Sequence, residues 1–132
     1  MRALLVIDMQ AGSFKPYTLR HDTMGVVERI NELARHFRAR CDKVIFIQHD
    51  GTKDNNFLPG TTDWRILPEL FISPADVMVS KTANDSFYPG TGLEHINEKK
   101  NIINFPIARG ESAESYMKKF NEEFLPMAYA FN

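Results

Sequence analysis

Three apolar segments of this 132-residue chain each end at polar side chains that could take part in chemistry. The segments are residues 3–7, 44–47 and 77–79, and they are followed by Asp8, by Gln48 and His49, and by Ser80 and Lys81. A carboxylate held beside an ammonium stays ionised and can accept a proton from a nucleophile. Asp8 and Lys81 are therefore candidate acid–base residues. Asp8 alone is also typical of a turn, and the pair is equally compatible with a structural ion pair.

The three apolar segments are typical of strands that are buried on both faces of a parallel sheet. Between the first two, apolar residues recur every three or four positions from Met24 to Phe37, which predicts an amphipathic helix with Asp22 or Thr23 as N-cap. Ligands bind beyond the carboxyl ends of the strands in open parallel sheets. We expect parallel strands with the first in the middle. We also expect the two charged side chains to lie within direct or one-water hydrogen-bonding reach and to face a pocket.

The rest of the chain continues the alternation of strands and helices. Residues 91–94 form a capping-box pattern before a short helix, and residues 101–107 predict a fourth strand that Pro106 interrupts. Ser112 can cap a further helix, and residues 127–131 offer a fifth strand. This order predicts an α/β fold with a mostly parallel sheet.

Composition and charge limit the classes of partner that the chain could have. The chain is 43% hydrophobic and 25% charged with a formal net charge of −1, and no basic stripe could neutralise a row of phosphates, so nucleic acid is not expected as a partner. The apolar run 3–7 is too short for a membrane span or a signal-peptide core, which favours a cytoplasmic protein without a membrane partner. The single cysteine, Cys41, precedes the second strand and is expected to be a packing residue.

No cofactor and no metal site is predicted. The four histidines are scattered, and His49 and Asp50 have no second histidine close by in the sequence. No glycine-rich phosphate loop follows the first strand, so nothing favours a nucleotide-binding protein.

Four blocks of the sequence resemble, in the same order, the isochorismatase-like cysteine hydrolases. These blocks, which lie within roughly residues 3–96, are ALLVIDMQ (3–10) followed by Phe14, VIFIQHD (44–50), PGT (59–61) with Trp64 and PEL (68–70), and KTANDSF (81–87) followed by TGLE (91–94). The resemblance implies a three-layer αβα sandwich with a Rossmann-like sheet. It also implies a Cys-Asp-Lys triad in which Asp8 matches the acid and Lys81 the lysine, with Phe14, Gln48 and Trp64 as substrate-binding residues.

In such enzymes a thiolate attacks a carbonyl or related carbon, and the acid shuttles its proton. Substrates across the family are small amides such as nicotinamide, carbamoyl compounds, or the vinyl ether of isochorismate. The resemblance therefore implies hydrolysis of a small molecule.

The sequence departs from the family at the nucleophile. Residues 107–117, where the family carries its cysteine, contain none. If Ala108 and Ser112 are aligned with the family's small residue and hydroxyl residue, Ser115 falls at the nucleophile position, and a shift by one would put Tyr116 there. Ser115 also fits an ordinary polar residue in the first turn of a surface helix. A serine hydroxyl needs a dedicated base, so the exchange is expected to cost most of the activity.

Residues 1–132 are expected to form a single isochorismatase-like domain that is shortened at its C-terminus, because family members continue for about 30 further residues. An uncovered strand edge invites association, which predicts a homo-oligomer. Two functions follow. The chain is either a hydrolase of a small amide, carbamoyl or vinyl-ether substrate, or a catalytically inactive relative, a pseudoenzyme, that serves as a small-molecule-binding or assembly module.

Overall fold

The computed structural model describes residues 2–15, 20–86, 91, 93, 118 and 122. The chain divides into two compact units, Met1–Ile102 and Ile103–Asn132, and all described residues except Lys118 and Glu122 lie in the first unit. The first unit contains β1 (Ala3–Ile7), η1 (Ala11–Phe14), α1 (Thr23–Ala39), β2 (Lys43–His49), η2 (Thr52–Asp54) and β3 (Val77–Lys81), where η denotes a short 3₁₀ helix. The expectation of one domain over residues 1–132 stays a prediction.

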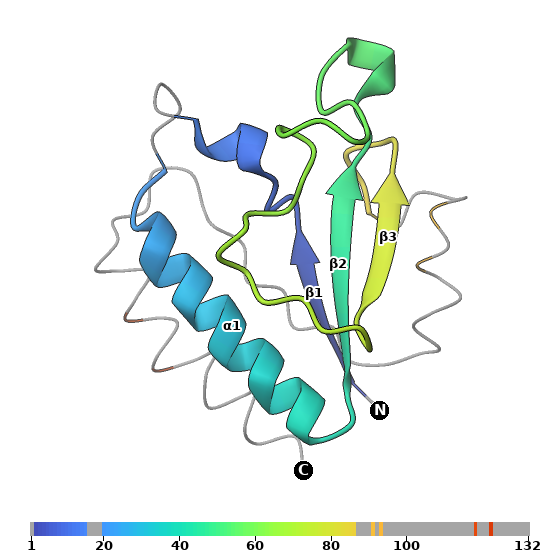
Figure 1. The fold of residues 1–132 in the computed structure, drawn as a ribbon. Helices are drawn as coiled ribbons and strands as arrows, with labels where there is room; N and C mark the ends of the chain where they lie inside the picture. The colour runs from blue at the N-terminus through green and yellow to red at the C-terminus, as the bar shows by residue number, and fades with distance from the viewer. Residues whose placement is uncertain are drawn as a thin grey trace. The chain divides into compact units, whose positions relative to one another are not determined.

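The three described strands form one parallel sheet in the order β1-β2-β3, and all three arrows point to the same end in Figure 1. Ile7 lies opposite Ile47, and His49 lies opposite Lys81, so the register brings the ends of the strands together. These three predicted strands and their parallel pairing are confirmed, and the fold is α/β. Among the three described strands, β2 lies in the middle and β1 at one side, so the expectation that the first strand is central is not met within the described residues.

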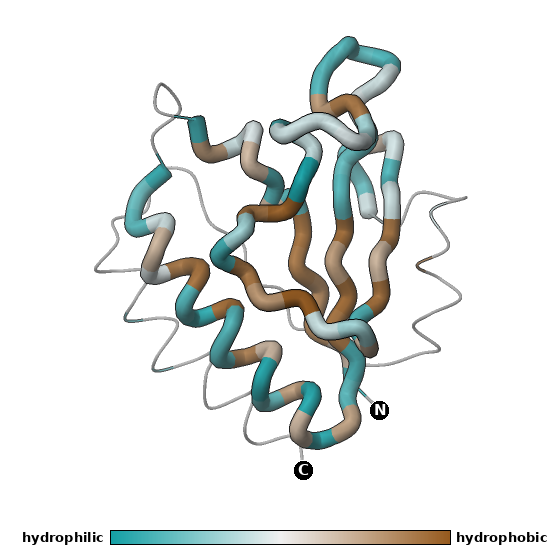
Figure 2. The backbone as a smooth tube through the Cα atoms, viewed as in Figure 1, coloured by the Kyte–Doolittle hydropathy of each residue, from teal (hydrophilic) through white to brown (hydrophobic). Residues whose placement is uncertain are grey.

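Strand β2 is apolar on both faces because it is covered on both. Val44 and Phe46 share one face with Leu4 and Val6 of β1, whereas Ile45 and Ile47 belong to a cluster with Val79 and Leu93 on the other face. That cluster holds no residue of α1, and α1 contacts β1 and β2, so the helix covers the first face. Figure 2 shows the strands apolar along most of their length and polar toward their carboxyl ends.

Helix α1 buries the side of its surface that the sequence predicts. Its buried residues are Val27, Leu33, Ala34 and Phe37. Ala34 lies seven residues after Val27, and Phe37 lies four residues after Leu33 and three after Ala34, as is typical of one helical face. Asp22 occupies the N-cap position but makes no capping hydrogen bond, because its backbone is left-handed with φ of 50° and its carboxylate pairs with Arg29 at 3.1 Å.

The expectation that Cys41 packs in the interior is wrong. Cys41 is exposed, with a left-handed φ of 57°, in the short turn that joins α1 to β2. Its backbone N–H bonds to the carbonyl of Arg38, so the reversal of the chain points the thiol outward.

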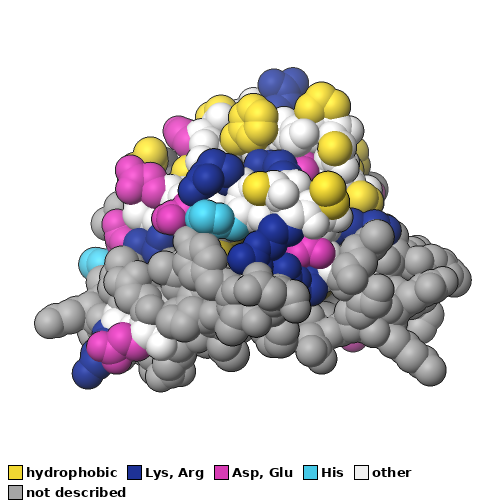
Figure 3. Space-filling model, turned by 90° about the horizontal axis from the view of Figure 1, so that it is seen from below, with side chains coloured by type: hydrophobic (Ala, Val, Ile, Leu, Met, Phe, Trp, Pro, Cys, Tyr) yellow, Lys and Arg dark blue, Asp and Glu magenta, His cyan; other side chains and the backbone are white. Residues whose placement is uncertain are grey.

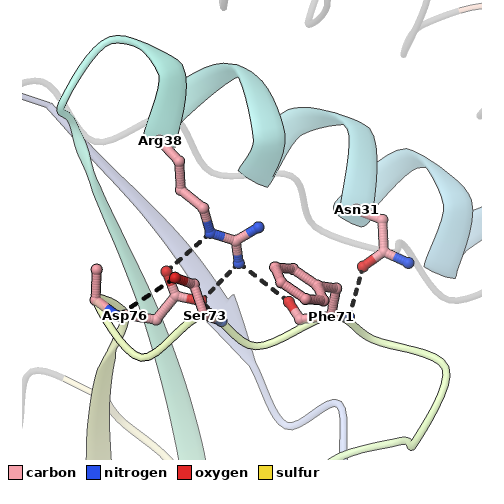
Figure 4. A network of polar contacts seen from close by, with 6 residues as sticks. Asn31, Arg38, Phe71, Ser73 and Asp76 are labelled. Carbon is pink, nitrogen blue, oxygen red and sulfur yellow. Dashed lines mark hydrogen bonds and ion pairs between the residues drawn. The ribbon is translucent and has the colours of Figure 1, made fainter.

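A polar network ties the connection between β2 and β3 to α1 (Figure 4). The guanidinium of Arg38 donates to both carboxylate oxygens of Asp76, at 2.9 and 2.6 Å, and to the carbonyl of Phe71 at 3.0 Å. The side-chain oxygen of Asn31 accepts the N–H of Phe71 at 2.9 Å, and the Asp76 side chain is 1% exposed. A bidentate bond of this kind fixes direction as well as distance, so the network holds the chain where β3 begins.

The C-terminal elements predicted from the sequence lie almost entirely outside the described residues. Leu93 is helical and its N–H donates to the Thr91 hydroxyl at 3.4 Å, as expected for a helix that begins there. The predicted strands 101–107 and 127–131 and the helix capped by Ser112 are not among the described residues.

Apolar, acidic and basic side chains are interspersed on the described part of the face at the amino ends of the strands (Figure 3). Among the described residues, no helix is long and apolar enough to cross a membrane.

The burial of β2 predicts how substitutions in it change the free energy of unfolding. Phe46 has no exposed surface, and truncating a buried aromatic side chain to alanine costs about 3–5 kcal/mol, so Phe46→Ala should lower the free energy of unfolding by that amount. Its partner in the register, Met78, is 46% exposed, and Met78→Ala should cost about 1 kcal/mol or less. Urea unfolding of the two variants measures this difference, and similar losses would contradict the burial of β2.

Candidate functional site

Two charged side chains meet where the strands end. The Lys81 Nζ atom lies 3.1 Å from the Asp8 Oδ2 atom and donates a second hydrogen bond to the carbonyl of Asn84 at 2.9 Å. Lys81 is 3% exposed, whereas the side chain of Asp8 is 49% exposed. The proximity that the sequence predicts is therefore found, and an ammonium without access to water is held by a carboxylate that a solute can reach.

The length of the lysine side chain makes this contact possible. Asp8 follows β1 and Lys81 ends β3, with β2 between them, so their backbones are about 10 Å apart at the ordinary spacing of strands. Lys81 is still in register with His49, and its carbonyl accepts the N–H of Asp50 at 2.8 Å. The four methylene groups of lysine bridge one strand, which a shorter cation would not.

Asp8 is positioned by the way β1 ends. Its N–H still donates to the carbonyl of Ile47 at 3.1 Å, but its φ of 58° is left-handed and turns the chain out of the sheet. Aspartate is among the residues that tolerate this conformation best. This turn and the bond to Ile47 fix the position of Asp8 at the end of the sheet.

Gln10 is a polar residue that sequence reasoning missed as a site residue. It is 1% exposed, and its carboxamide accepts the N–H of His49 at 2.7 Å while donating to the carbonyls of His49 and Trp64 at 3.0 and 2.8 Å. The only signal in the sequence was its place two residues after Asp8 in the block 3–10. Its partners are 39 and 54 residues away, so spacing could not reveal them.

Two of the predicted substrate-binding residues are brought together. Gln48 is 7% exposed, and its Nε2 atom donates to the carbonyl of Trp64 at 3.1 Å, the same carbonyl that Gln10 contacts. The indole Nε1 of Trp64 is buried and has no hydrogen-bond partner in the described part of the chain.

Phe14 is the last residue of η1, and η1 lies beside the Trp64 segment. The backbones of the two segments pair, because the N–H groups of Ala11 and Gly12 donate to the carbonyls of Arg65 and Asp63 at 2.8 and 3.0 Å. A side chain at Gly12 would start 2.8 Å from the Phe57 ring and 2.9 Å from the Asp63 Cβ atom, so the close approach requires glycine.

Further titratable groups lie at the end of β2 and directly after it, at His49 and Asp50. Hydrogen bonds from the side chain and then the backbone of Thr52 hold the pKa of Asp50 below its ordinary value. The His49 ring meets Phe57 edge to face, with ring centroids 6.2 Å apart. Within the described ranges, no three His, Cys, Asp or Glu side chains are grouped to hold a metal ion. Ser115, the expected nucleophile, lies outside the described residues.

Comparison with known proteins gives a family match over most of the chain. The sequence profile of the isochorismatase domain matches residues 2–108. Among solved structures, an isochorismatase family protein is 29% identical with a TM-score of 0.66, covering 72% of this chain and 55% of that one. A hydrolase of the isochorismatase family from Chromobacterium violaceum is 30% identical with a TM-score of 0.63, covering 72% and 49%.

The same fold is found in N-carbamoylsarcosine amidase from Thermoplasma acidophilum, which is 22% identical with a TM-score of 0.61, covering 73% of this chain and 60% of that one. No match was found among curated protein sequences. The chain spans about half the length of the first two structures.

The unequal burial of the ion pair predicts unequal costs of breaking it. Asp8→Asn keeps the left-handed turn but leaves a buried ammonium without its counter-charge, and should lower the free energy of unfolding by about 1–3 kcal/mol. Lys81→Met keeps the length of the side chain and leaves a carboxylate that water can solvate, so it should cost less. Urea unfolding measures both, and an equal or greater loss in Lys81→Met would contradict the asymmetry.

Proposed function

This chain belongs to the isochorismatase family of hydrolases, and we propose that it acts on a small amide, carbamoyl or vinyl-ether substrate at the carboxyl ends of β1, β2 and β3. The observation that carries the proposal is the contact between Asp8 and Lys81, a reachable carboxylate held by a buried ammonium at the edge where parallel sheets bind ligands. One of the similar structures is an amidase by name, which fits this substrate class.

The proposed chemistry assigns a role to each side chain. Asp8 accepts the proton of the nucleophile and returns it to the leaving group, and Lys81 keeps that carboxylate charged and oriented. Ser115 is the proposed nucleophile. With an amide or carbamoyl substrate its oxygen attacks the carbonyl carbon, the C–N bond breaks as the amine leaves with the proton from Asp8, and water hydrolyses the resulting ester. Phe14 and Trp64 form apolar walls around the substrate, and Gln48 supports Trp64 from behind.

A second function, binding without turnover, is favoured by one observation. The only cysteine, Cys41, is exposed in the turn before β2, so the length of that strand, about 20 Å, separates it from Asp8 and Lys81. No thiol of this chain can then serve at the site. In this alternative the site holds a small ligand, and the chain acts as a binding or assembly module that forms homo-oligomers, in the cytoplasm.

Turnover and its dependence on the ion pair distinguish the two functions. We expect weak hydrolysis by the unmodified protein of one member of a panel of nicotinamide, carbamoyl compounds and isochorismate, with kcat falling about 100-fold or more in Asp8→Asn and Lys81→Met. Asp54→Asn and Lys53→Met make the same chemical changes at exposed positions of η2 and should leave kcat unchanged. Full activity in Asp8→Asn would contradict the assignment, and ligand binding without turnover would support the binding module.

The proposed nucleophile predicts a gain of activity. Ser115→Cys should raise turnover above that of the unmodified protein, because a thiol with an ordinary pKa of about 8.5 already supplies some thiolate at neutral pH, whereas serine supplies almost no alkoxide. Steady-state rates on the same panel measure the gain, with Ser112→Cys as the matched control. Robust turnover of the unmodified protein that survives Ser115→Ala would show that another residue is the nucleophile.

A further inference from the structure

The backbone pairing of β1 with β2 stops before β2 ends. The last backbone bond runs from the N–H of Asp8 to the carbonyl of Ile47, after which the chain turns out of the sheet. His49 still has an N–H and a carbonyl on this side, and the Gln10 carboxamide bonds to both, at 2.7 and 3.0 Å. The side chain thus replaces the peptide group that a longer β1 would have supplied.

The same carboxamide reaches a third segment. Its second N–H donates to the carbonyl of Trp64 at 2.8 Å, where the Nε2 of Gln48 adds a bond of 3.1 Å. The buried Trp64 indole N–H has no partner within the described residues, and such a group favours movement of its segment toward water. Backbone bonds from Ala11 and Gly12 hold the neighbours of Trp64, Arg65 and Asp63. The two glutamines hold the carbonyl of Trp64 itself and oppose its movement.

We propose that Gln10 is the positioning residue of this site, a carboxamide that fixes Trp64 against the end of β2. Its effect on Trp64 is independent of catalysis, and only its effect on turnover rests on the proposed function. Gln10 holds the wall of the site formed by Trp64 at a set place relative to the carboxylate of Asp8.

Glutamine suits this place because of its hydrogen-bonding groups. The amide nitrogen uses both of its N–H groups as donors, to His49 and Trp64, and the amide oxygen accepts the third bond, from His49. A glutamate of the same shape would set carboxylate oxygens against two carbonyls, and a methionine would leave His49 and Trp64 without partners. Either replacement should release the Trp64 segment.

The chain carries its own probe of this release, because Trp64 is its only tryptophan. We expect the constant for acrylamide quenching of Trp64 fluorescence to rise about twofold or more in Gln10→Met and Gln10→Glu, and less in Gln48→Met, which removes one donor. Asn31→Leu is the matched control, since Asn31 is a carboxamide that bonds to Glu69 and Phe71 of the same connection, away from Trp64. Its quenching constant should match that of the unmodified protein.

Acid should reverse the effect in Gln10→Glu alone. Burial against two carbonyls raises the pKa of the new carboxyl, and its protonated form regains one donor beside the acceptor. Quenching in Gln10→Glu should therefore return toward the unmodified value as pH falls from about 8 to about 5, while Gln10→Met stays high. Asp8, His49, Asp50 and Asp63 lie on the segments around this carboxyl, and their own titration is removed by comparison with the unmodified protein and Gln10→Met.

The outcomes separate this proposal from the proposed function. Unchanged quenching in folded Gln10→Met, or no recovery of Gln10→Glu in acid, overturns the positioning role whether or not the protein is active. Where the unmodified protein turns over a substrate, KM should rise about tenfold in Gln10→Met with a smaller change in kcat, because the wall moves while Asp8 and Lys81 remain. A panel without turnover counts against the proposed function alone, since the quenching comparison still decides the role of Gln10.

Discussion

A buried ammonium must be matched by a negative charge, and in this chain the match lies across a strand. Lys81 is 3% exposed at the end of β3, and its partner Asp8 stands beyond the end of β1. Removing a charge from water costs several kcal/mol unless the partner is close and well oriented. The arrangement therefore depends on everything that keeps β1, β2 and β3 in register, above all on the fully buried β2.

Support for that register comes from opposite ends of the sheet. At the amino end of β3, Arg38 of α1 holds Asp76 in a bidentate bond just before the strand begins. At the carboxyl end of β1, Gln10 continues the pairing with β2 after the backbone has turned away. Both contacts join segments far apart in sequence through a planar group with fixed bond directions, so they set angles as well as distances.

Sequence alone predicted the elements whose signal is local. Residues 3–7 match β1 in full, and Asp8 and Lys81 were found because charged residues at the ends of apolar strands stand out. Gln10 was missed because its role arises from hydrogen bonds to residues far along the chain. Cys41 was expected to be a packing residue because it precedes the second strand at its amino end, but a tight reversal of the chain there decides its exposure. Hydropathy carries no information about such a turn.

The two proposed functions, hydrolase and binding module, use the same described residues. They differ in whether the side chain at position 115 can act as a nucleophile. The contacts among Asp8, Lys81, Gln10 and Trp64 would be the same in either case, because none of them depends on a nucleophile. One nearby positive charge or a helix N-terminus lowers the pKa of a thiol enough to form a thiolate. A hydroxyl, in contrast, must lose its proton to a base as it attacks. With serine at position 115, the rate would depend on how well Asp8 accepts that proton. The same Asp8 carboxylate is the partner of the buried Lys81, so the ion pair sets the place from which the carboxylate would have to reach that hydroxyl.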